Sequence, residues 1–166
     1  MIADDDDLSR LAARVLDACR AKGLKVATAE SCTGGTVAGA LTAIAGSSNV
    51  LDRGFITYSN DAKTDMLGVS ATLIERFGAV SEAVARAMAE GALAYSKADV
   101  SVSVTGIAGP GGATPDKPVG LVHLAASRRG GTVVHERHVF PGDRTAVRRR
   151  SVEAALRLIE RQALSA

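Results

Sequence analysis

Apolar side chains recur at helical spacing in two long segments of the chain. Leucine, valine and cysteine return every three or four positions over residues 8–22, which predicts an amphipathic helix. A second apolar stripe predicts a helix over residues 82–97, and Ser81 directly before it is a residue type that caps helices. Small residues and helix start signals predict three further helices, over residues 36–45, from a cap at Ser70 to Phe77, and over residues 144–164.

Short apolar runs separate these helices and predict strands. The expected strands cover residues 24–27, 53–58, 100–105, 119–127 and 132–140. The last two flank a turn with two glycines and therefore predict an antiparallel hairpin. Strands that alternate with helices and then end in a hairpin predict an α/β protein, with a three-layer α/β/α fold and a mixed, mostly parallel sheet of about five strands. We expect one domain over residues 1–166, because no repeat or linker divides the chain.

The composition is that of a folded protein with an aliphatic core. Apolar residues make up 46% of the 166 residues, whereas aromatic residues make up 3%. No apolar run is long enough to cross a bilayer, and the acidic run at residues 4–7 is the opposite of the basic start of a signal peptide. Cys19 and Cys32 form neither a disulfide framework nor a metal-type cluster. We therefore expect a cytoplasmic protein without membrane contact and without a metal or other cofactor.

Residues 28–35, with the sequence TAESCTGG, are the most informative stretch. They lie between a predicted strand and a predicted helix, where the helix N-terminus offers free N–H groups and a partial positive charge. The Ser31 hydroxyl is there a candidate nucleophile for a carbonyl carbon. Backbone N–H groups of Thr33, Gly34 and Gly35 are candidate donors to the resulting oxyanion. The alternative is that Ser31 or Thr33 only caps the helix.

Two more turns follow predicted strands, at residues 58–63 and 105–112. In an open α/β sheet such turns converge on one crevice, which is the usual ligand site. A Lys63 amine that is partly desolvated beside Ser31 is a candidate general base, and Tyr58 is a candidate to relay or orient the proton. The alternatives are a solvated surface lysine and a strand-end tyrosine with its ring in the core.

Other ionisable residues give weaker signals. Cys32 is a rival nucleophile, because a helix N-terminus lowers the pKa of a thiol, but without a neighbouring histidine we favour buried packing. Glu30 is expected either to orient Lys63 or to pair with a surface cation. The histidines do not predict a catalytic or metal site, since His135 and His138 are three apart in a strand and face opposite sides.

Arg144 and Arg148 lie four residues apart near the start of the last predicted helix and therefore share one face. An arginine pair suits a phosphate group through bidentate hydrogen bonds. The alternative is a solvated basic face, to which we assign Arg149 and Arg150. The net charge of +2 is too small to indicate a nucleic-acid partner by itself.

Several short motifs occur in order along the chain. They are TAESCTGG at 28–35, GSS at 46–48, YSN at 58–60 with Lys63, LGV at 67–69, GAVSE at 78–82, GIAGP at 106–110, KPVG at 117–120, and GDR at 142–144 with Val147 and Arg148. Through them nearly the whole chain resembles the C-terminal domain family of the competence-damage-inducible protein CinA. So many motifs in the same order are much more specific than any one of them.

The resemblance implies an activity, because stand-alone members of this family are nicotinamide-nucleotide amidases. It implies a hydrolase of pyridine nucleotide salvage that converts nicotinamide mononucleotide to nicotinic acid mononucleotide and ammonia. It also implies Ser31 as the nucleophile, with Lys63 and Tyr58 assisting, and it suggests a homodimer.

The substrate phosphate then needs cationic or N–H partners, and we expect them at Arg144, at Arg148 and in the loop that begins with Thr105 and Gly106. Two alternatives stay open. The first is a non-catalytic nucleotide-binding or regulatory module that uses the same glycine loops. The second is RNA binding through the arginine-rich last helix, against which the scarcity of aromatic residues argues.

Overall fold

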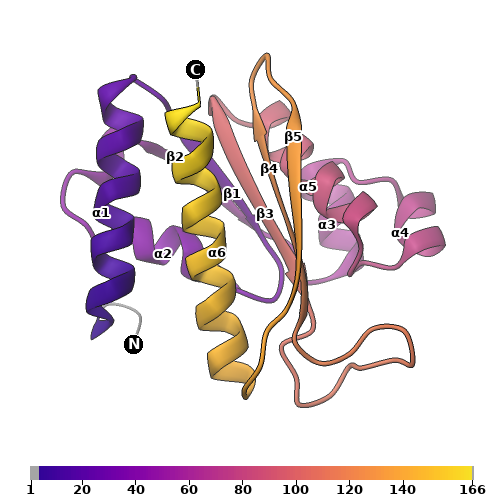
Figure 1. The fold of residues 1–166 in the computed structure, drawn as a ribbon. Helices are drawn as coiled ribbons and strands as arrows, with labels where there is room; N and C mark the ends of the chain where they lie inside the picture. Colours follow the sequence, from indigo (N-terminus) through magenta and orange to yellow (C-terminus); the bar gives the residue numbers. More distant parts are fainter. Residues whose placement is uncertain (1–3, 166) are drawn as a thin grey trace.

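A five-stranded mixed sheet lies between two layers of helices in the computed structural model, which describes residues 4–165 (Figure 1). The strands are arranged in the order β2 (Leu51–Ile56), β1 (Val26–Glu30), β3 (Val100–Gly106), β4 (Leu121–Arg128), β5 (Val133–Val139). β1 pairs in parallel with β2 and β3, whereas β4 is antiparallel to both β3 and β5. Every strand except β4 therefore runs in the same direction. The predicted three-layer α/β fold with a terminal hairpin is confirmed.

The helices divide between the two faces of the sheet (Figure 1). One face is covered by α1 (Asp6–Ala21), α2 (Thr36–Thr42) and α6 (Arg144–Leu164). The other face is covered by α5 (Glu82–Ala94), against which α3 (Asn60–Leu67) and α4 (Ala71–Phe77) pack. A short 3₁₀ helix, η2 (Ser47–Asn49), leads into β2. Within residues 4–165, no helix is long and apolar enough to cross a membrane.

The central strand β3 is buried on both faces, although its sequence alternates valine with serine. Its valines join the core under α1 and α6. Its serines face α5, where the hydroxyls of Ser101 and Ser103 donate to the carbonyl oxygens of Ala89 and Ala85, each at 2.6 Å. A buried hydroxyl is tolerated when it is hydrogen-bonded, so these serines attach α5 to the sheet rather than marking a solvent face.

Two local differences from the sequence-based prediction affect the candidate site. Strand β1 extends to Glu30, so residues 28–30 belong to the strand and not to the following turn. Helix α3 was not predicted, because its eight residues carry only a weak apolar stripe. Its start is set by Ser59, whose hydroxyl accepts a hydrogen bond from the Ala62 N–H at 3.0 Å.

Helix α3 is held close to α5 at Gly91. A Cβ atom at this position would lie 2.1 Å from the carbonyl oxygen of Leu67, at the end of α3. An alanine at an unobstructed position in a helix stabilises by about 1 kcal/mol relative to glycine. We expect the opposite sign for Gly91→Ala, a loss of roughly 1–3 kcal/mol from overpacking, measured by chemical denaturation.

Gly39 in α2 is the matched control, because a Cβ atom there would meet nothing within 4 Å. We expect Gly39→Ala to stabilise the protein by about 0.5–1 kcal/mol. Equal stabilisation by the two substitutions would contradict the close approach of α3 and α5.

Candidate active site

Ser31 is the first residue after β1, in the turn that leads to α2. Its N–H still donates to the Val104 carbonyl oxygen at 2.9 Å, so the sheet fixes its backbone. The Gly34 N–H then donates to the Ser31 carbonyl oxygen at 3.0 Å. Gly34 and Gly35 have φ values of +58° and +96°, which other residues rarely adopt. The two glycines therefore permit the sharp turn that leaves the Ser31 side chain at the carboxyl edge of the sheet.

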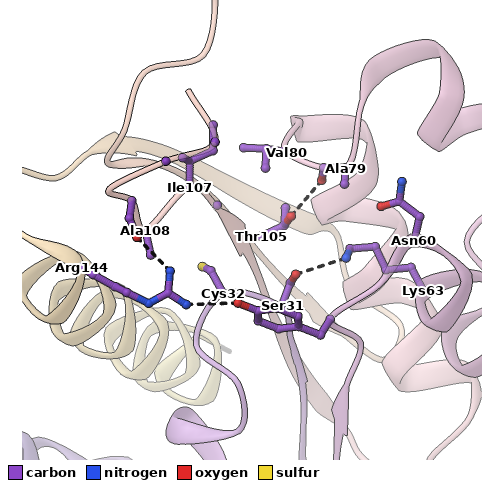
Figure 2. Close-up of a pocket in the computed structure, with 15 residues that line it drawn as sticks. Ser31, Cys32, Asn60, Lys63, Ala79, Val80, Thr105, Ile107, Ala108 and Arg144 are labelled. Carbon is purple, nitrogen blue, oxygen red and sulfur yellow. Dashed lines mark hydrogen bonds between the residues drawn. The ribbon is translucent and has the colours of Figure 1, made fainter. Parts of the chain in front are cut away.

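Lys63 reaches this serine from α3, on the opposite side of the sheet from α2 (Figure 2). Its side chain is only 1% exposed, and its Nζ lies 3.2 Å from Ser31 Oγ. Nζ also donates to the carbonyl oxygens of Thr57, at 2.9 Å, and Ser59, at 3.5 Å. These three acceptors match the three N–H groups of the ammonium. When the amine is neutral, its two N–H groups can stay on the carbonyls while its lone pair faces the Ser31 hydroxyl.

Burial lowers the pKa of Lys63 below its usual range, because the charged ammonium loses hydration. The nearby Cys32 acts in the opposite direction and is the smaller cause. Among the residues that line the pocket around Lys63 there is no aspartate or glutamate to stabilise its charge. Burial therefore shifts the equilibrium of Lys63 toward the neutral amine, the form that can accept a proton.

A pocket of about 290 Å³ opens beside Ser31 and Lys63. The structure brings together there the three turns that the sequence analysis singled out, at residues 31–32, 58–63 and 105–112. Gly106 belongs to its wall, and a Cβ atom there would lie 2.7 Å from Val122 Cγ2. The neighbouring Thr105 hydroxyl donates to the Ala79 carbonyl oxygen at 2.8 Å, which connects this loop to the segment before α5 (Figure 2).

Arg144 and Tyr58 border the same pocket, and the structure joins them to each other. One guanidinium nitrogen of Arg144 donates to the Tyr58 hydroxyl oxygen at 3.1 Å, and another donates to the Gly109 carbonyl oxygen at 2.9 Å. Tyr58 is 63% exposed and thus stands at the rim. Its hydroxyl contacts Arg144 rather than Lys63 or Ser31, so a proton relay through Tyr58 has no direct contact behind it and stays a prediction.

Four other predicted site residues do not line the pocket: Thr33, Gly34, Gly35 and Arg148. Arg148 instead donates to the carbonyl oxygens of Cys32, at 3.1 Å, and Thr33, at 3.2 Å. Its guanidinium therefore holds the turn that carries Ser31. The N–H of Gly34 is engaged by the Ser31 carbonyl and is not available to an oxyanion. Donation from Thr33 and Gly35 stays a prediction.

Neither Cys32 nor the histidines are placed to take over the chemistry of Ser31 and Lys63. Cys32 lines the pocket but is only 6% exposed, and burial raises the pKa of its thiol to about 11, so the thiolate needed for attack is scarce. His123 Nδ1 and His135 Nε2 lie 2.9 Å apart, between β4 and β5, and neither residue lines the pocket. No group of three or more His, Cys, Asp or Glu residues in the described part of the chain is placed to hold a metal ion.

Glu30 takes neither of its predicted roles. Its buried carboxylate accepts hydrogen bonds from the backbone N–H groups of Val37 and Ala38, at 2.8 and 3.1 Å, and contacts neither Lys63 nor a surface cation. The prediction was wrong because β1 continues to Glu30, which turns the side chain under α2.

The sequence analysis did not individually select three pocket residues, Asn60, Ala79 and Val80. Asn60 is the first residue of α3, a helix that was not predicted, and Figure 2 shows its amide at the edge of the pocket beside Lys63. Ala79 and Val80 are small apolar residues before α5 and carry no chemical signal of their own. Asn60 lies within the turn at residues 58–63 that the sequence analysis selected as a whole, whereas the GAVSE motif was the indication for Ala79 and Val80.

The fold and the pocket define an α/β protein with a serine–lysine pair at the carboxyl edge of its parallel strands. Residues 8–163 match the CinA C-terminal domain, and the chain belongs to this family.

Relatives of two lengths resemble the chain. It is 48% identical over 160 residues to the nicotinamide-nucleotide amidohydrolase PncC of Escherichia coli K12, a match that covers 96% of this chain and 97% of that protein. It is 54% identical over 133 residues to a CinA-like protein of Akkermansia muciniphila, covering 80% of this chain but 32% of that protein, so the chain spans about a third of this longer relative. The crystal structure of the competence/damage-inducible protein CihA from Agrobacterium tumefaciens superposes with a TM-score of 0.91 at 54% identity, covering 92% of this chain and 93% of that one.

The raised pKa of Cys32 leads to a direct test. At pH 8 we expect iodoacetamide to alkylate Cys32 in the native protein at least about 100-fold more slowly than in the unfolded chain, because a pKa near 11 leaves little thiolate. Peptide mass spectrometry of timed samples measures the rate. Rapid alkylation of Cys32 in the native protein would show a reactive thiolate and would make Cys32 a candidate nucleophile again.

Proposed function

We propose that this protein is a nicotinamide-nucleotide amidase that hydrolyses the carboxamide of nicotinamide mononucleotide to nicotinic acid mononucleotide and ammonia. The observation that carries the proposal is the 3.2 Å contact between Lys63 Nζ and Ser31 Oγ inside the pocket. The choice of substrate is supported by the family and by the named activity of the E. coli relative, which matches nearly end to end.

A carboxamide requires an activated nucleophile and a proton for its leaving group. In our scheme Ser31 Oγ attacks the carboxamide carbon while its proton passes to the neutral Lys63 amine. The tetrahedral adduct then breaks its C–N bond, and the Lys63 ammonium returns the proton to the departing nitrogen, which leaves as ammonia. The result is an ester between Ser31 and the nicotinoyl group.

A water molecule completes the cycle by the same exchange. Lys63, neutral again, accepts a proton from the water as its oxygen attacks the ester carbon. The adduct breaks its bond to Ser31 Oγ, which takes the proton back from Lys63, and nicotinic acid mononucleotide is released. One basic group serves both halves, as is usual in acyl transfer through a serine.

Charge in the pocket supports an anionic substrate. Arg144 lines it with a permanent positive charge, whereas Lys63 is neutral in the proposed scheme, and no acidic side chain lines the pocket. Arg144 is at the rim and is the candidate for the phosphate, since a guanidinium donates two parallel hydrogen bonds. Lys63 is then left for the reacting carboxamide.

Ion pairs along α6 argue against the RNA alternative. Arg149 pairs with Asp5 and Glu153, Arg157 pairs with Glu153, and Arg161 pairs with Glu136, while Arg150 is exposed. A homodimer is supported by the family resemblance and stays a prediction.

The function is tested by incubating the pure protein with nicotinamide mononucleotide and a chelator, and measuring ammonia and the acid product. We expect stoichiometric release of both, which Ser31→Ala abolishes and Cys32→Ser does not. Absence of ammonia with the wild-type protein would favour the non-catalytic binding module.

The base role of Lys63 makes a separate prediction. Because the protonated amine must first lose its proton, kcat/KM should rise with pH through a value below the pKa of free lysine, about 10.4. Lys63→Arg should lower kcat by about 10²- to 10⁴-fold, since a guanidinium keeps its charge and cannot accept the proton. An arginine variant with substantial activity and an intact rising limb would show that Lys63 acts only as a fixed charge.

The phosphate role of Arg144 is tested with two substrates. Arg144→Leu should lower kcat/KM for the mononucleotide by about 10- to 150-fold, the cost of losing charged hydrogen bonds worth roughly 1.5–3 kcal/mol. Its effect on nicotinamide riboside, which has no phosphate, should be small. Arg148→Leu is the comparison, and it should affect both substrates equally because Arg148 contacts only backbone carbonyls. Equal losses with both substrates in Arg144→Leu would place the phosphate elsewhere.

A further inference from the structure

Glu30 is an acidic side chain buried directly beside the candidate nucleophile, and the reaction scheme does not use it. It is the last residue of β1 and is 1% exposed. Its Oε1 accepts a hydrogen bond from the Val37 N–H at 2.8 Å, and its Oε2 accepts one from the Ala38 N–H at 3.1 Å. The Thr28 hydroxyl donates to Oε2 at 3.3 Å. Three donors therefore satisfy the hydrogen-bonding capacity of this buried side chain.

These bonds replace the usual cap of α2. The residue at the cap position is Gly35, which has no side chain to offer, and neither Ser31 nor Thr33 caps the helix. The first N–H groups of a helix need acceptors from outside the helix, and a negative charge there is favoured by the helix dipole. Glu30, at the other end of the turn, supplies the acceptors and the negative charge. It therefore closes residues 31–36 into a loop that is fixed at its two ends.

The same residue is also connected to Lys63 through the main chain. The Glu30 carbonyl oxygen accepts a hydrogen bond from the Thr57 N–H at 2.9 Å. The Thr57 carbonyl oxygen in turn accepts one from Lys63 Nζ at 2.9 Å. Glu30 is therefore covalently joined to Ser31 and linked through Thr57 to Lys63. A shift of Glu30 would change the distance between Ser31 Oγ and Lys63 Nζ.

We propose that Glu30 is a positioning residue, whose carboxylate holds the turn so that Ser31 Oγ stays within reach of Lys63 Nζ. This rests on the proposed function for its kinetic consequence. Because the carboxylate contacts α2 and not the pocket, its loss should affect the chemical step and leave phosphate binding by Arg144 intact. Misplacement of a reacting group by about 1 Å can cost about 100-fold in rate.

The direct test is Glu30→Gln, which keeps the size of the side chain but turns an NH₂ group toward one of the two backbone N–H donors. We expect kcat for nicotinamide mononucleotide to fall by about 10- to 100-fold, while KM changes by less than about threefold. Glu30→Ala, which removes both acceptors, should lose at least as much.

A second readout does not depend on the physiological substrate. Sulfonylation of Ser31 by a sulfonyl fluoride, followed by intact-protein mass spectrometry, reports the reactivity of the hydroxyl alone. We expect the rate to fall in Glu30→Gln by a factor similar to that for kcat. If the wild-type protein is sulfonylated but releases no ammonia, the proposed function fails while the positioning role is still judged by this rate.

Two further variants separate positioning from general loss of stability. Ser70→Ala removes the cap of α4, which like α2 has seven residues. The Ser70 hydroxyl accepts a hydrogen bond from the Leu73 N–H at 3.3 Å. It should lower the melting temperature and leave kcat unchanged. Gly54→Ala keeps the carboxylate but would place a Cβ 2.8 Å from Thr28 Oγ1 and 3.4 Å from Ala38 Cβ, so it should disturb the same contacts and lower kcat.

The overturning result is a Glu30→Gln protein that melts earlier, as Ser70→Ala does, yet keeps kcat and the sulfonylation rate within twofold of wild type. Glu30 would then be a structural cap only. If Glu30→Gln does not fold, Gly54→Ala decides alone: lowered kcat and sulfonylation at unchanged KM support positioning, and unchanged values overturn it. Failure of the wild-type protein to be sulfonylated at Ser31 would overturn it as well, because there would be no activated hydroxyl to position.

Discussion

The candidate site is built around one physical constraint: the Lys63 amine is buried away from water, in a pocket lined by no carboxylate. Lys63 has almost no exposed surface, and its Nζ is surrounded by two carbonyl oxygens and the Ser31 hydroxyl. Desolvation lowers its pKa, and the pocket wall supplies no carboxylate that would restore it. In the proposed mechanism this lowered pKa makes the neutral amine available as a base. An added pyridinium charge from the proposed substrate would act in the same direction.

The surrounding structure serves to keep that contact short. Ser31 is held by β3 on one side, while Arg148 and Glu30 fix the turn from opposite directions, the first through carbonyl groups and the second through N–H groups. Lys63 is placed by α3, whose position depends on its close packing against α5 at Gly91. These supports come from both helical layers, and the serine and the lysine meet at the edge of the sheet between them.

The sequence was sufficient to predict the fold and the proximity of Ser31 and Lys63. It was insufficient where the structure depends on contacts between distant segments. The strand and helix order, the hairpin and the caps at Ser70 and Ser81 follow local rules, and they were predicted. Helix α3 was missed because its weak apolar stripe is stabilised by α5 rather than by its own pattern. Arg144 and Arg148 look equivalent in sequence, but one faces the pocket and the other faces the Ser31 turn. Sequence spacing cannot distinguish these two arginines, because their different contacts depend on where the Ser31 turn passes α6 in the folded protein.

The most direct measurement of the central claim is the titration of Lys63 itself. In protein labelled with ¹⁵N at lysine Nζ, the resonance that disappears in Lys63→Met belongs to this residue. We expect it to titrate below the pKa of free lysine, about 10.4, because the amine is buried. Titration at or above that value would mean that the amine is charged at neutral pH, and would contradict its role as the base that activates Ser31.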